Sequence, residues 1–504
     1  MHREIERAYD IGPGVPLPDL TAVEGVATVT PPRVVELSAT YLDTDDLRLV
    51  RSGVTLRRRL GGDDEGWHLK VPVGPVRAAA RDEVQRAAGA TARAPRPLTR
   101  AITPWTLGRP VAPVAVIETR RTLRHLLGAD GQVLAEVADD EVVGTPGDGG
   151  PVSTWRELEV ELVGAGPALL DAADDVLAAA GVHPRTEQRK IGTVLAHRLP
   201  TPDDDGPPAA DSPAGVVLTR RLVALVGDLR RHDSEVRRGV PDGVHQLRVT
   251  CRRLRGALAT FRPLLERERT DPLRDELRWL ARALGSGRDA EVVGDRLLSL
   301  AAAEGAVDAA ARRRVRRSTT ARLREADARA QDLLDSPRHR RLLRRLDALA
   351  AEPPLTDRAA KPASKALRRR VRRDWHRLPG RFDAVGDAEP GTREHDEALH
   401  EVRKAAKRLR YACEALEPVW GRDARRLRKT AQQVTRVLGE RNDTVLTRRE
   451  LPRLAREATA SGENAFGYGV LFAREEQRGA ELDADLDAAR HRLARPARRR
   501  WLKG

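Results

Sequence analysis

The chain is poor in aromatic residues and cysteine, and each shortage excludes a class of protein. Aromatics make up 3% of the 504 residues, which disfavours a surface that stacks on the bases of single-stranded nucleic acid. The only cysteines, Cys251 and Cys413, are too few for a disulfide framework or a cysteine zinc site. Both lie in helical patterns, so we expect small core residues in a reducing compartment.

Long apolar runs are also missing. No uncharged apolar stretch reaches the roughly 18 residues that a membrane-spanning helix needs. The opening residues, Met1–Glu6, show no hydrophobic signal region. We therefore expect a cytoplasmic protein without a membrane partner.

Positive charge is abundant but unevenly distributed. The chain has 91 Lys and Arg against 75 Asp and Glu, a net charge of +16. Residues 1–200 hold 24 basic and 28 acidic residues, whereas residues 214–504 hold 67 and 43, a net +24. A polyanionic partner for the second half follows. Only eight of the basic residues are lysines, and Lys70 and Lys190 are the two in the first half.

A short acidic, proline-rich segment divides the chain. Residues 201–214 have nothing to bury and predict a linker. Over residues 1–200, apolar and polar residues alternate in short runs, which predicts mostly antiparallel β structure with a few helices. Residues 215–504 show the period of amphipathic helices, which predicts an all-α domain. The expected fold class is α+β, in two domains.

Two segments of the helical half recur at nearly one spacing. Residues 245–255 (HQLRVTCRRLR) return as 400–410 (HEVRKAAKRLR), and 284–289 return as 438–443. Two linked matches predict a duplicated helical bundle. We expect both Leu-Gly segments to be turns between helices. The predicted repeats span about 215–350 and 362–504.

Each copy of the repeated helix separates an apolar stripe from a cationic stripe. At 100° per residue, the basic positions of each copy fall within one narrow arc and the leucines on another. Arginine binds phosphate oxygens bidentately, so a ladder of arginines suits a repeating anion. The alternative is a solvated charged face, but few acids interrupt the stripe, and the stripe occurs twice. The stripes comprise His245, Arg248, Arg252, Arg255, His400, Arg403, Lys407 and Arg410.

Carboxylates share one face of several predicted strands in the first half. Glu4 and Glu6 lie two residues apart, as do Glu157, Glu159 and Glu161, so each set points to one side of its strand. A barrel whose interior mixes carboxylates with Arg and Lys can hold a hard divalent cation together with a phosphate chain. The alternative is an ordinary antiparallel sheet with one wet face. Further sets on one face are Glu136 with Asp140, Arg57 with Arg59, and His68 with Lys70.

The duplicated helix resembles the CHAD domain. The pattern H-x-x-R-x-x-x-[RK]-[RK]-L-R occurs twice in order, each time followed by L-G-x-x-[RN]-D, over about residues 215–504. The resemblance implies two stacked helical bundles with a basic central pore or groove. It also implies that this groove binds inorganic polyphosphate through the eight stripe positions.

Residues 1–200 resemble the CYTH domain, the triphosphate tunnel metalloenzyme fold. Glu4-Ile5-Glu6-Arg7-Ala8 is close to the opening E-x-E-x-K, and the later segments follow in family order. The resemblance implies an eight-stranded antiparallel tunnel with helices, which hydrolyses inorganic triphosphate or a related substrate, or cyclises ATP. Implied ligands of Mg²⁺ or Mn²⁺ are Glu4, Glu6, Glu136, Asp140, Glu157, Glu159 and Glu161, of which Glu4 and Glu6 are also catalytic. Implied phosphate-binding residues are Arg57, Arg59, Lys70, Arg81, Arg120 and Lys190.

One position departs from the family pattern, because Ala8 stands where the motif has lysine. The resemblance implies that this lysine positions or activates the water beside the cleaved phosphoryl group. Arg7 has the wrong strand parity to replace it. Phosphoryl transfer depends on positioning and charge neutralisation, so losing one cation can slow the reaction strongly while binding survives.

The leading hypothesis is a polyphosphate-associated protein, located at polyphosphate granules. Its helical domain binds polyphosphate, and its tunnel binds and hydrolyses a triphosphate with a divalent metal. The second hypothesis is a non-catalytic polyphosphate-binding scaffold or sensor with a degenerate tunnel. The third is a nucleic-acid binder, which the few aromatics and the missing recognition-helix motif disfavour. An adenylate cyclase also stays open for the tunnel.

Overall fold

The computed structural model describes residues 2–74, 80–89, 93–185, 190–200, 206, 208–305, 307–389, 392–495 and 500–502. Side chains of residues 2–4, 80 and 286–291 lie outside the description, as does much of the predicted linker over 201–214. The chain divides into two compact units, Met1–Asp203 and Asp204–Gly504, and each is described by itself. Within the described residues, no helix is both long and apolar enough to cross a membrane.

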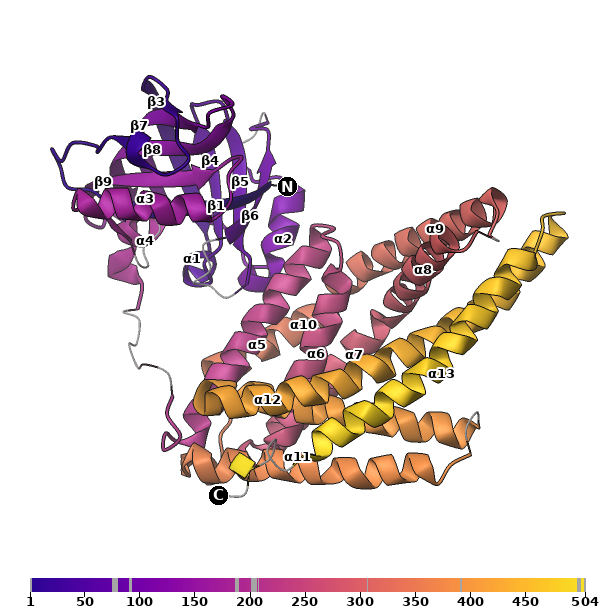
Figure 1. The fold of residues 1–504 in the computed structure, drawn as a ribbon. Coiled ribbons are helices and arrows are strands. Elements are labelled where there is room, and N and C mark those ends of the chain that lie inside the picture. Colours follow the sequence, from indigo (N-terminus) through magenta and orange to yellow (C-terminus); the bar gives the residue numbers. More distant parts are fainter. Residues whose placement is uncertain are drawn as a thin grey trace. The chain divides into compact units, whose positions relative to one another are not determined.

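Eight antiparallel strands form a ring in the first unit (Figure 1). The order is β1, β6, β5, β4, β3, β7, β8, β9 and back to β1, whose first half pairs with β6 and whose second half pairs with β9. The predicted eight-stranded antiparallel tunnel fold is confirmed. Two-residue strands β2 (Thr28–Val29) and β10 (His183–Pro184) pair with β7 and β1. The ring strands are β1 (His2–Asp10), β3 (Arg33–Asp43), β4 (Thr55–Leu60), β5 (Gly66–Pro72), β6 (Ala80–Arg86), β7 (Ala112–Leu127), β8 (Val133–Pro146) and β9 (Ser153–Leu162).

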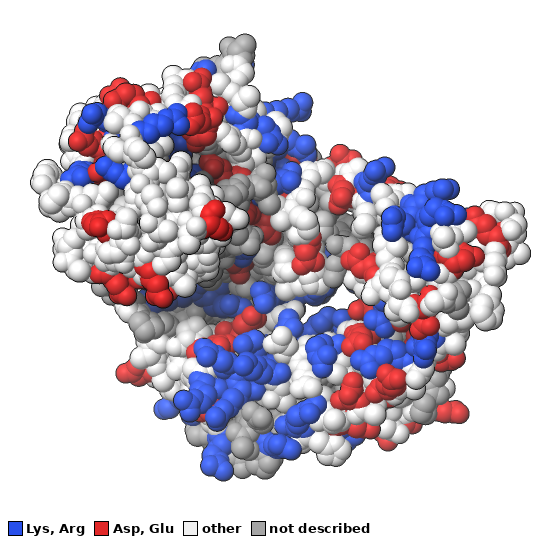
Figure 2. Space-filling model, turned by 45° about the horizontal axis from the view of Figure 1, so that its top comes forward, with Lys and Arg blue, Asp and Glu red and all other residues white. Residues whose placement is uncertain are grey.

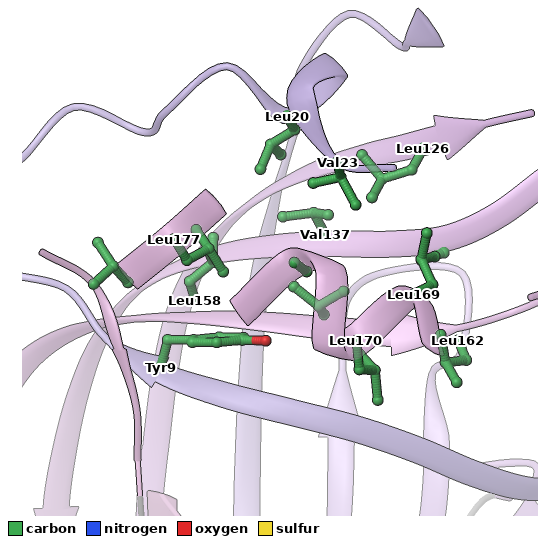
Figure 3. Close-up of a cluster of buried hydrophobic side chains, with 14 of the residues drawn as sticks. Tyr9, Leu20, Val23, Leu126, Val137, Leu158, Leu162, Leu169, Leu170 and Leu177 are labelled. Atoms are coloured by element: carbon green, nitrogen blue, oxygen red, sulfur yellow. The ribbon is translucent and has the colours of Figure 1, made fainter. Parts of the chain in front are cut away.

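Strand alternation divides the side chains of the ring between an outer and an inner face. On the outer face, Tyr9, Leu158 and Leu162 pack under Leu170 and Leu177 of α3 (Ala168–Ala179) (Figure 3). Helix α2 (Arg96–Thr106) covers the outer face of β4, β5 and β6 in the same way. Because these helices take up the apolar face, the charged face of each strand points inward.

A short helix packs against the inner face. In α4 (Lys190–Val194), Ile191 and Val194 contact a cluster that includes Tyr41 and Ile117. Tyr41 lies directly across from Arg57 on the neighbouring strand, so the two share the inner face. The apolar contacts of α4 therefore carry Lys190 into the ring.

Apart from two isolated bridges, the described elements of the second unit are all helices, as expected. Neighbouring helices pack in pairs, such as α8 with α9 and α12 with α13 (Figure 1). Both cysteines are free and fully buried in α6 and α12. The helices longer than one turn are α5 (Ala214–Arg237), α6 (Gly243–Thr260), α7 (Arg267–Ala283), α8 (Gly285–Ala303), α9 (Ala309–Asp335), α10 (Pro337–Ala351), α11 (Ala363–Gly386), α12 (Arg393–Ala460) and α13 (Phe466–Ala494).

Helix α12 overturns one expected turn. The first Leu-Gly segment does separate two helices, because α7 ends at Ala283 and α8 begins at Gly285. The second, Leu438-Gly439, lies inside the 68-residue α12. The predicted turn there is wrong because one buried stripe continues through Leu438 to Leu451, so the helix has packing on both sides of the glycine.

Candidate functional site

Three carboxylates face one another across adjacent strands of the ring. The register of β1, β9 and β8 sets Glu6, Glu161 and Glu136 directly opposite each other, and such positions lie about 5 Å apart at Cβ. We call these three residues the acidic row. The pKa of Glu161 is raised to about 7, above all by burial, then by the charges of Glu6 and Glu136, against the opposing effect of Lys70.

The acidic row offers carboxylate ligands to a divalent cation, although its oxygen atoms do not all lie within 4.8 Å of one another. Arg81 lies 3.2 Å from Glu6 and His125 lies 3.3 Å from Glu136, so one basic side chain meets each end. Burial is the main cause of the raised pKa of Glu161, and a bound cation would oppose it by stabilising the charged carboxylate. Carboxylate oxygens are the ligands that Mg²⁺ and Mn²⁺ prefer. The backbone of Glu4 pairs with Arg81 at the same end, but the Glu4 side chain lies outside the described residues.

A second carboxylate group holds a lysine instead. One ligand atom from each of Asp140, Glu157 and Glu159 lies within 4.8 Å of the others. The Nζ atom of Lys190 contacts Asp140 and lies 3.0 Å from Glu157 and 3.3 Å from Glu159. Burial alone lowers the pKa of Lys190, but Glu159 and Asp140 outweigh it, and the pKa is raised above its ordinary value.

Two arginines complete the charge balance of this lysine-centred group. Arg121 donates to Asp140 and, at 2.7 Å, to Glu159, and Arg185 donates to Glu157 at 2.6 Å. Burial raises the pKa of Glu159, but Lys190 and Arg121 outweigh burial and hold it far below its usual range. Three carboxylates thus meet three cations. The predicted metal ligands therefore fall into two sets, and Lys190, Arg121 and Arg185 already neutralise the second.

Basic side chains line the inner face of the strands on the other side of β1. Arg57 and Arg59 project from β4, Lys70 from β5 and Arg81 from β6. Arg57 donates to the hydroxyl oxygen of Tyr41 at 3.1 Å. Among the described residues, the buried Nε atoms of Arg57, Arg59 and Arg81 have no hydrogen-bond partner. These donors suit phosphate oxygens.

Arg120 is not part of this inner face, which corrects the sequence-based prediction. Its guanidinium is exposed on the outside of the ring, 3.6 Å from Glu36 and 3.4 Å from Glu141. The next residue, Arg121, points inward. Strand alternation did not show which of the two adjacent arginines faces inward. Polar residues flank them at both odd and even positions of the strand, so neither face is marked as the apolar one. Arg185 was also missed, because it follows a strand of only two residues.

Ala8 lies beside the lysine-centred group. It is directly opposite Glu159, which has Ala138 on its other side. The neighbouring Arg7 points outward and pairs with Asp171 and Asp174 of α3. Strand parity thus keeps the Arg7 side chain out of the interior of the ring, as expected. The nearest described ammonium to Glu159 is that of Lys190, which belongs to α4.

In the helical unit, the two cationic stripes face each other. The pKa of Lys407 on α12 is lowered to about 7 by burial, then by Arg403 and Arg410 of its own helix and Arg248 and Arg252 of α6. We call these five residues the basic cluster. The helices approach closely beside it, since a Cβ atom on Gly256 would lie 3.2 Å from the ring of Tyr411.

Two glycines accommodate arginines of the basic cluster. Arg248 donates to the carbonyl oxygen of Gly285 at 3.1 Å. A Cβ atom on Gly439 would lie 3.3 Å from the guanidinium of Arg403. The repeated Leu-Gly segments therefore serve a shared purpose, close approach of an arginine, although only the first is a turn.

The remaining stripe residues lie around the basic cluster. His400 is exposed and lines a hollow of about 150 Å³ together with Arg403, Arg441 and Asn442. The pKa of Arg255 is lowered by burial and then by three arginines of α7, which the sequence analysis did not single out. Those three are Arg274, Arg278 and Arg282. His245 is half-buried in the first turn of α6.

Comparison with known proteins agrees with this division. The CYTH domain model matches residues 2–186, and the CHAD domain model matches residues 220–452. Two uncharacterized proteins from strains of Mycobacterium tuberculosis are 34% identical over 520 residues, covering 99% of this chain and 98% of theirs.

Solved structures match one unit at a time. PptA from Streptomyces chartreusis is 24% identical, with a TM-score of 0.47, and the match covers 56% of this chain and 100% of that one. The CHAD domain from Ricinus communis is 26% identical, with a TM-score of 0.45, covering 58% and 96%. A putative adenylyl cyclase from Hippeastrum, described as having a dominant triphosphatase activity, is 14% identical, with a TM-score of 0.26, covering 40% and 98%. The chain belongs to the CYTH and CHAD families, with a CYTH domain followed by a CHAD domain.

Proposed function

We propose that the CHAD domain binds inorganic polyphosphate and that the CYTH domain binds and hydrolyses a triphosphate, with tripolyphosphate as the substrate, at polyphosphate granules. The observation that carries the enzymatic part is the division of the inner face. The acidic row lies on β1, β9 and β8, and arginines whose buried Nε atoms have no described hydrogen-bond partner lie on β4 and β6.

The chain's own residues account for binding and orientation. Arg57, Arg59, Lys70 and Arg81 hold the phosphate oxygens from one side. Lys190, fixed by three carboxylates, adds a positive charge beside the acidic row. Mg²⁺ or Mn²⁺ held by Glu4, Glu6, Glu136 and Glu161 would neutralise phosphoryl oxygens and lower the pKa of bound water.

Phosphate release tests the enzymatic part. We expect the full chain to release phosphate from tripolyphosphate with Mg²⁺ or Mn²⁺, and faster than from ATP or thiamine triphosphate. Glu6→Gln with Glu161→Gln removes two charges of the acidic row and should abolish turnover. Glu141→Gln, on the exposed outer face of the same sheet, is the matched control and should leave turnover unchanged. Absence of metal-dependent turnover in the wild type contradicts the enzymatic proposal.

Ala8 favours a second candidate, a non-catalytic triphosphate-binding scaffold. The motif lysine is missing, and the Lys190 ammonium beside Glu159 is already engaged by three carboxylates. In this case wild-type protein binds tripolyphosphate without cleaving it, and Ala8→Lys restores turnover. An active wild type that Ala8→Lys does not accelerate excludes the scaffold.

The basic cluster carries the polyphosphate part of the proposal. Its charges come from two helices, and burial of Lys407 among four arginines raises the free energy of the empty site. A polyanion relieves this repulsion. Arg403→Ala with Lys407→Ala should lower affinity for polyphosphate by about a hundredfold or more at low salt. Equal binding by this variant and the wild type would exclude the basic cluster as the site.

A further inference from the structure

Helix α11 carries a second concentration of arginine outside the basic cluster. Five of its side chains line an open hollow of about 750 Å³. Four of them are exposed and Arg370 is half-buried. We call these residues the α11 patch: Arg369, Arg370, Arg372, Arg373 and His376.

Neighbouring acids do not neutralise the α11 patch. In the part of the chain that the structure describes, no carboxylate forms an ion pair with any of its four arginines. The acid within the run, Asp374, is 2% exposed and pairs with Arg377 at 2.8 Å and Arg408 at 2.9 Å. The pKa of Arg370 is lowered by burial, then by Arg369 and two further arginines. The patch therefore holds like charges that an anion would stabilise.

Helix α5, the counterpart of α11 in the first predicted repeat, has uncharged residues at three of the five positions of the α11 patch. Pro213 and Pro362 directly precede α5 and α11 and pair with each other as a bridge. From these prolines, residues 218–229 of α5 and 367–378 of α11 share nearly the same order of buried and exposed positions. The exposed positions of Arg372, Arg373 and His376 correspond to Val223, Ala224 and Gly227 in α5, whereas Arg369 and Arg370 correspond to Arg220 and Arg221. The charge of Arg372 and Arg373 thus belongs to α11 rather than to the architecture of the repeat.

Helix α9 offers a matched comparison. The six residues RRRVRR occur at 312–317 in α9 and at 368–373 in α11. In α9, Arg314 pairs with Glu463 at 2.9 Å and Arg312 donates to the carbonyl oxygen of Val307 at 2.7 Å. The same six-residue sequence therefore has an acidic partner, Glu463, in α9, whereas in α11 it lines the open hollow.

We propose that the α11 patch is a second contact site for inorganic polyphosphate, engaged by chains long enough to occupy it together with the basic cluster. This inference rests on the proposed function of the helical unit. One long polyanion that reaches two sites of a single unit gains affinity through effective concentration, whereas a short chain does not. No Phe, Tyr or Trp side chain lines the hollow, whose one ring is the imidazole of His376, and Trp375 beside it is 6% exposed. The patch therefore suits a phosphate chain better than a nucleic acid, whose bases stack on aromatic rings.

Paired variants of the full chain test the inference. Arg372→Ala with Arg373→Ala should weaken binding of long-chain polyphosphate about tenfold at low salt, and should lower the slope of log K against log salt by about one for each lost contact. Tripolyphosphate binding should not change. Arg316→Ala with Arg317→Ala, at the equivalent positions of the identical six-residue sequence in α9, should change the affinity for long-chain polyphosphate less than about twofold. Arg372→Lys with Arg373→Lys should keep most of the affinity, because the charge is kept.

Each outcome of the comparison decides a specific point. Wild-type long-chain affinity in the α11 variant overturns the inference while leaving the proposed function intact. An equal loss in the α9 variant also overturns it, because net charge alone would then explain the effect. Loss of duplex DNA binding without loss of polyphosphate binding assigns the patch to another ligand. If the wild type binds no polyphosphate, the proposed function fails, and the inference fails with it.

Discussion

At the scale of single residues, Lys407 couples ligand binding to pH. Its pKa is lowered to about 7 by burial and by Arg403, Arg252, Arg410 and Arg248, so it is largely neutral above pH 7 in the absence of ligand. A bound polyanion favours the ammonium and raises the pKa again. Binding above pH 7 therefore takes up one proton, and affinity should fall by up to about tenfold per pH unit as pH rises. Titrations at constant ionic strength from about pH 6 to 9 measure this slope.

Lys407→Arg is the control for this prediction. Arginine keeps its charge across the range, so the affinity of this variant should not depend on pH above 7. The nearby His400 has its pKa lowered by burial and by Lys404 and Arg403, so it is neutral where the slope is measured. A wild-type profile as flat as that of the variant contradicts the prediction.

Strand alternation predicts which residues face inward only where the flanking residues settle the parity. Arg57 and Arg59 alternate with the buried Leu56 and lie on the inner face as expected. Arg120 and Arg121 are adjacent, and the prediction of a phosphate-binding residue fell on Arg120, which points outward. The role of Lys190 depended on α4 packing inside the ring, which is a tertiary contact that no local pattern contains.

At the scale of helices, α12 contains a conformational defect that can be measured. Gly421 has φ of 44° and ψ of −113°, outside the helical region, and divides the long helix. A Cβ atom there would meet nothing within 4 Å, so any cost of Gly421→Ala is backbone strain. We expect a loss of about 1–3 kcal/mol in the free energy of unfolding. Chemical denaturation of the two proteins measures it.

Gly380 in α11 provides the opposite case. It is exposed within a helix, and a Cβ atom there also meets nothing within 4 Å. Gly380→Ala should therefore stabilise by about 0.5–1 kcal/mol, because alanine loses less backbone entropy than glycine. A stabilising Gly421→Ala, or equal effects at both positions, would show that the bend at Gly421 does not require a positive φ.

Helical periodicity predicted where helices lie better than where they end. The helical period over residues 215–504 predicted an all-α domain, and α5 to α13 form it. Within α12, the backbone leaves the helical region at Gly421, three residues after Pro418. The turn expected at Leu438-Gly439 is absent, because α13 packs along α12 there, with Arg478 2.9 Å from Glu440. Local propensity does not contain that partner.

For the whole molecule, the separation of charge follows the separation of cores. In the described part of the chain, the hydrophobic clusters beneath α3, α2 and α4 draw on the first unit alone. The cluster among α8, α9, α12 and α13 draws on the second unit alone. The first half has a net charge of −4 and the second half +24, so a polyanion is drawn to the helical unit first. This division was predicted from the acidic, proline-rich segment and from the change of hydrophobic period, because both are local signals of the sequence.

Separate cores predict two unfolding transitions in calorimetry of the full chain. Leu158→Ala, in the first unit, and Leu454→Ala, in the second, each remove a buried side chain and should each lower one transition by several degrees. Long-chain polyphosphate should then raise the transition that Leu454→Ala lowers, by roughly 5–10 °C at a hundredfold excess over Kd. Tripolyphosphate with Mg²⁺ should raise the transition that Leu158→Ala lowers. A single transition whose temperature both substitutions lower would mean that the two units unfold as one. If polyphosphate raises only the transition of the first unit, the polyanion binds to the ring of strands instead of the helices.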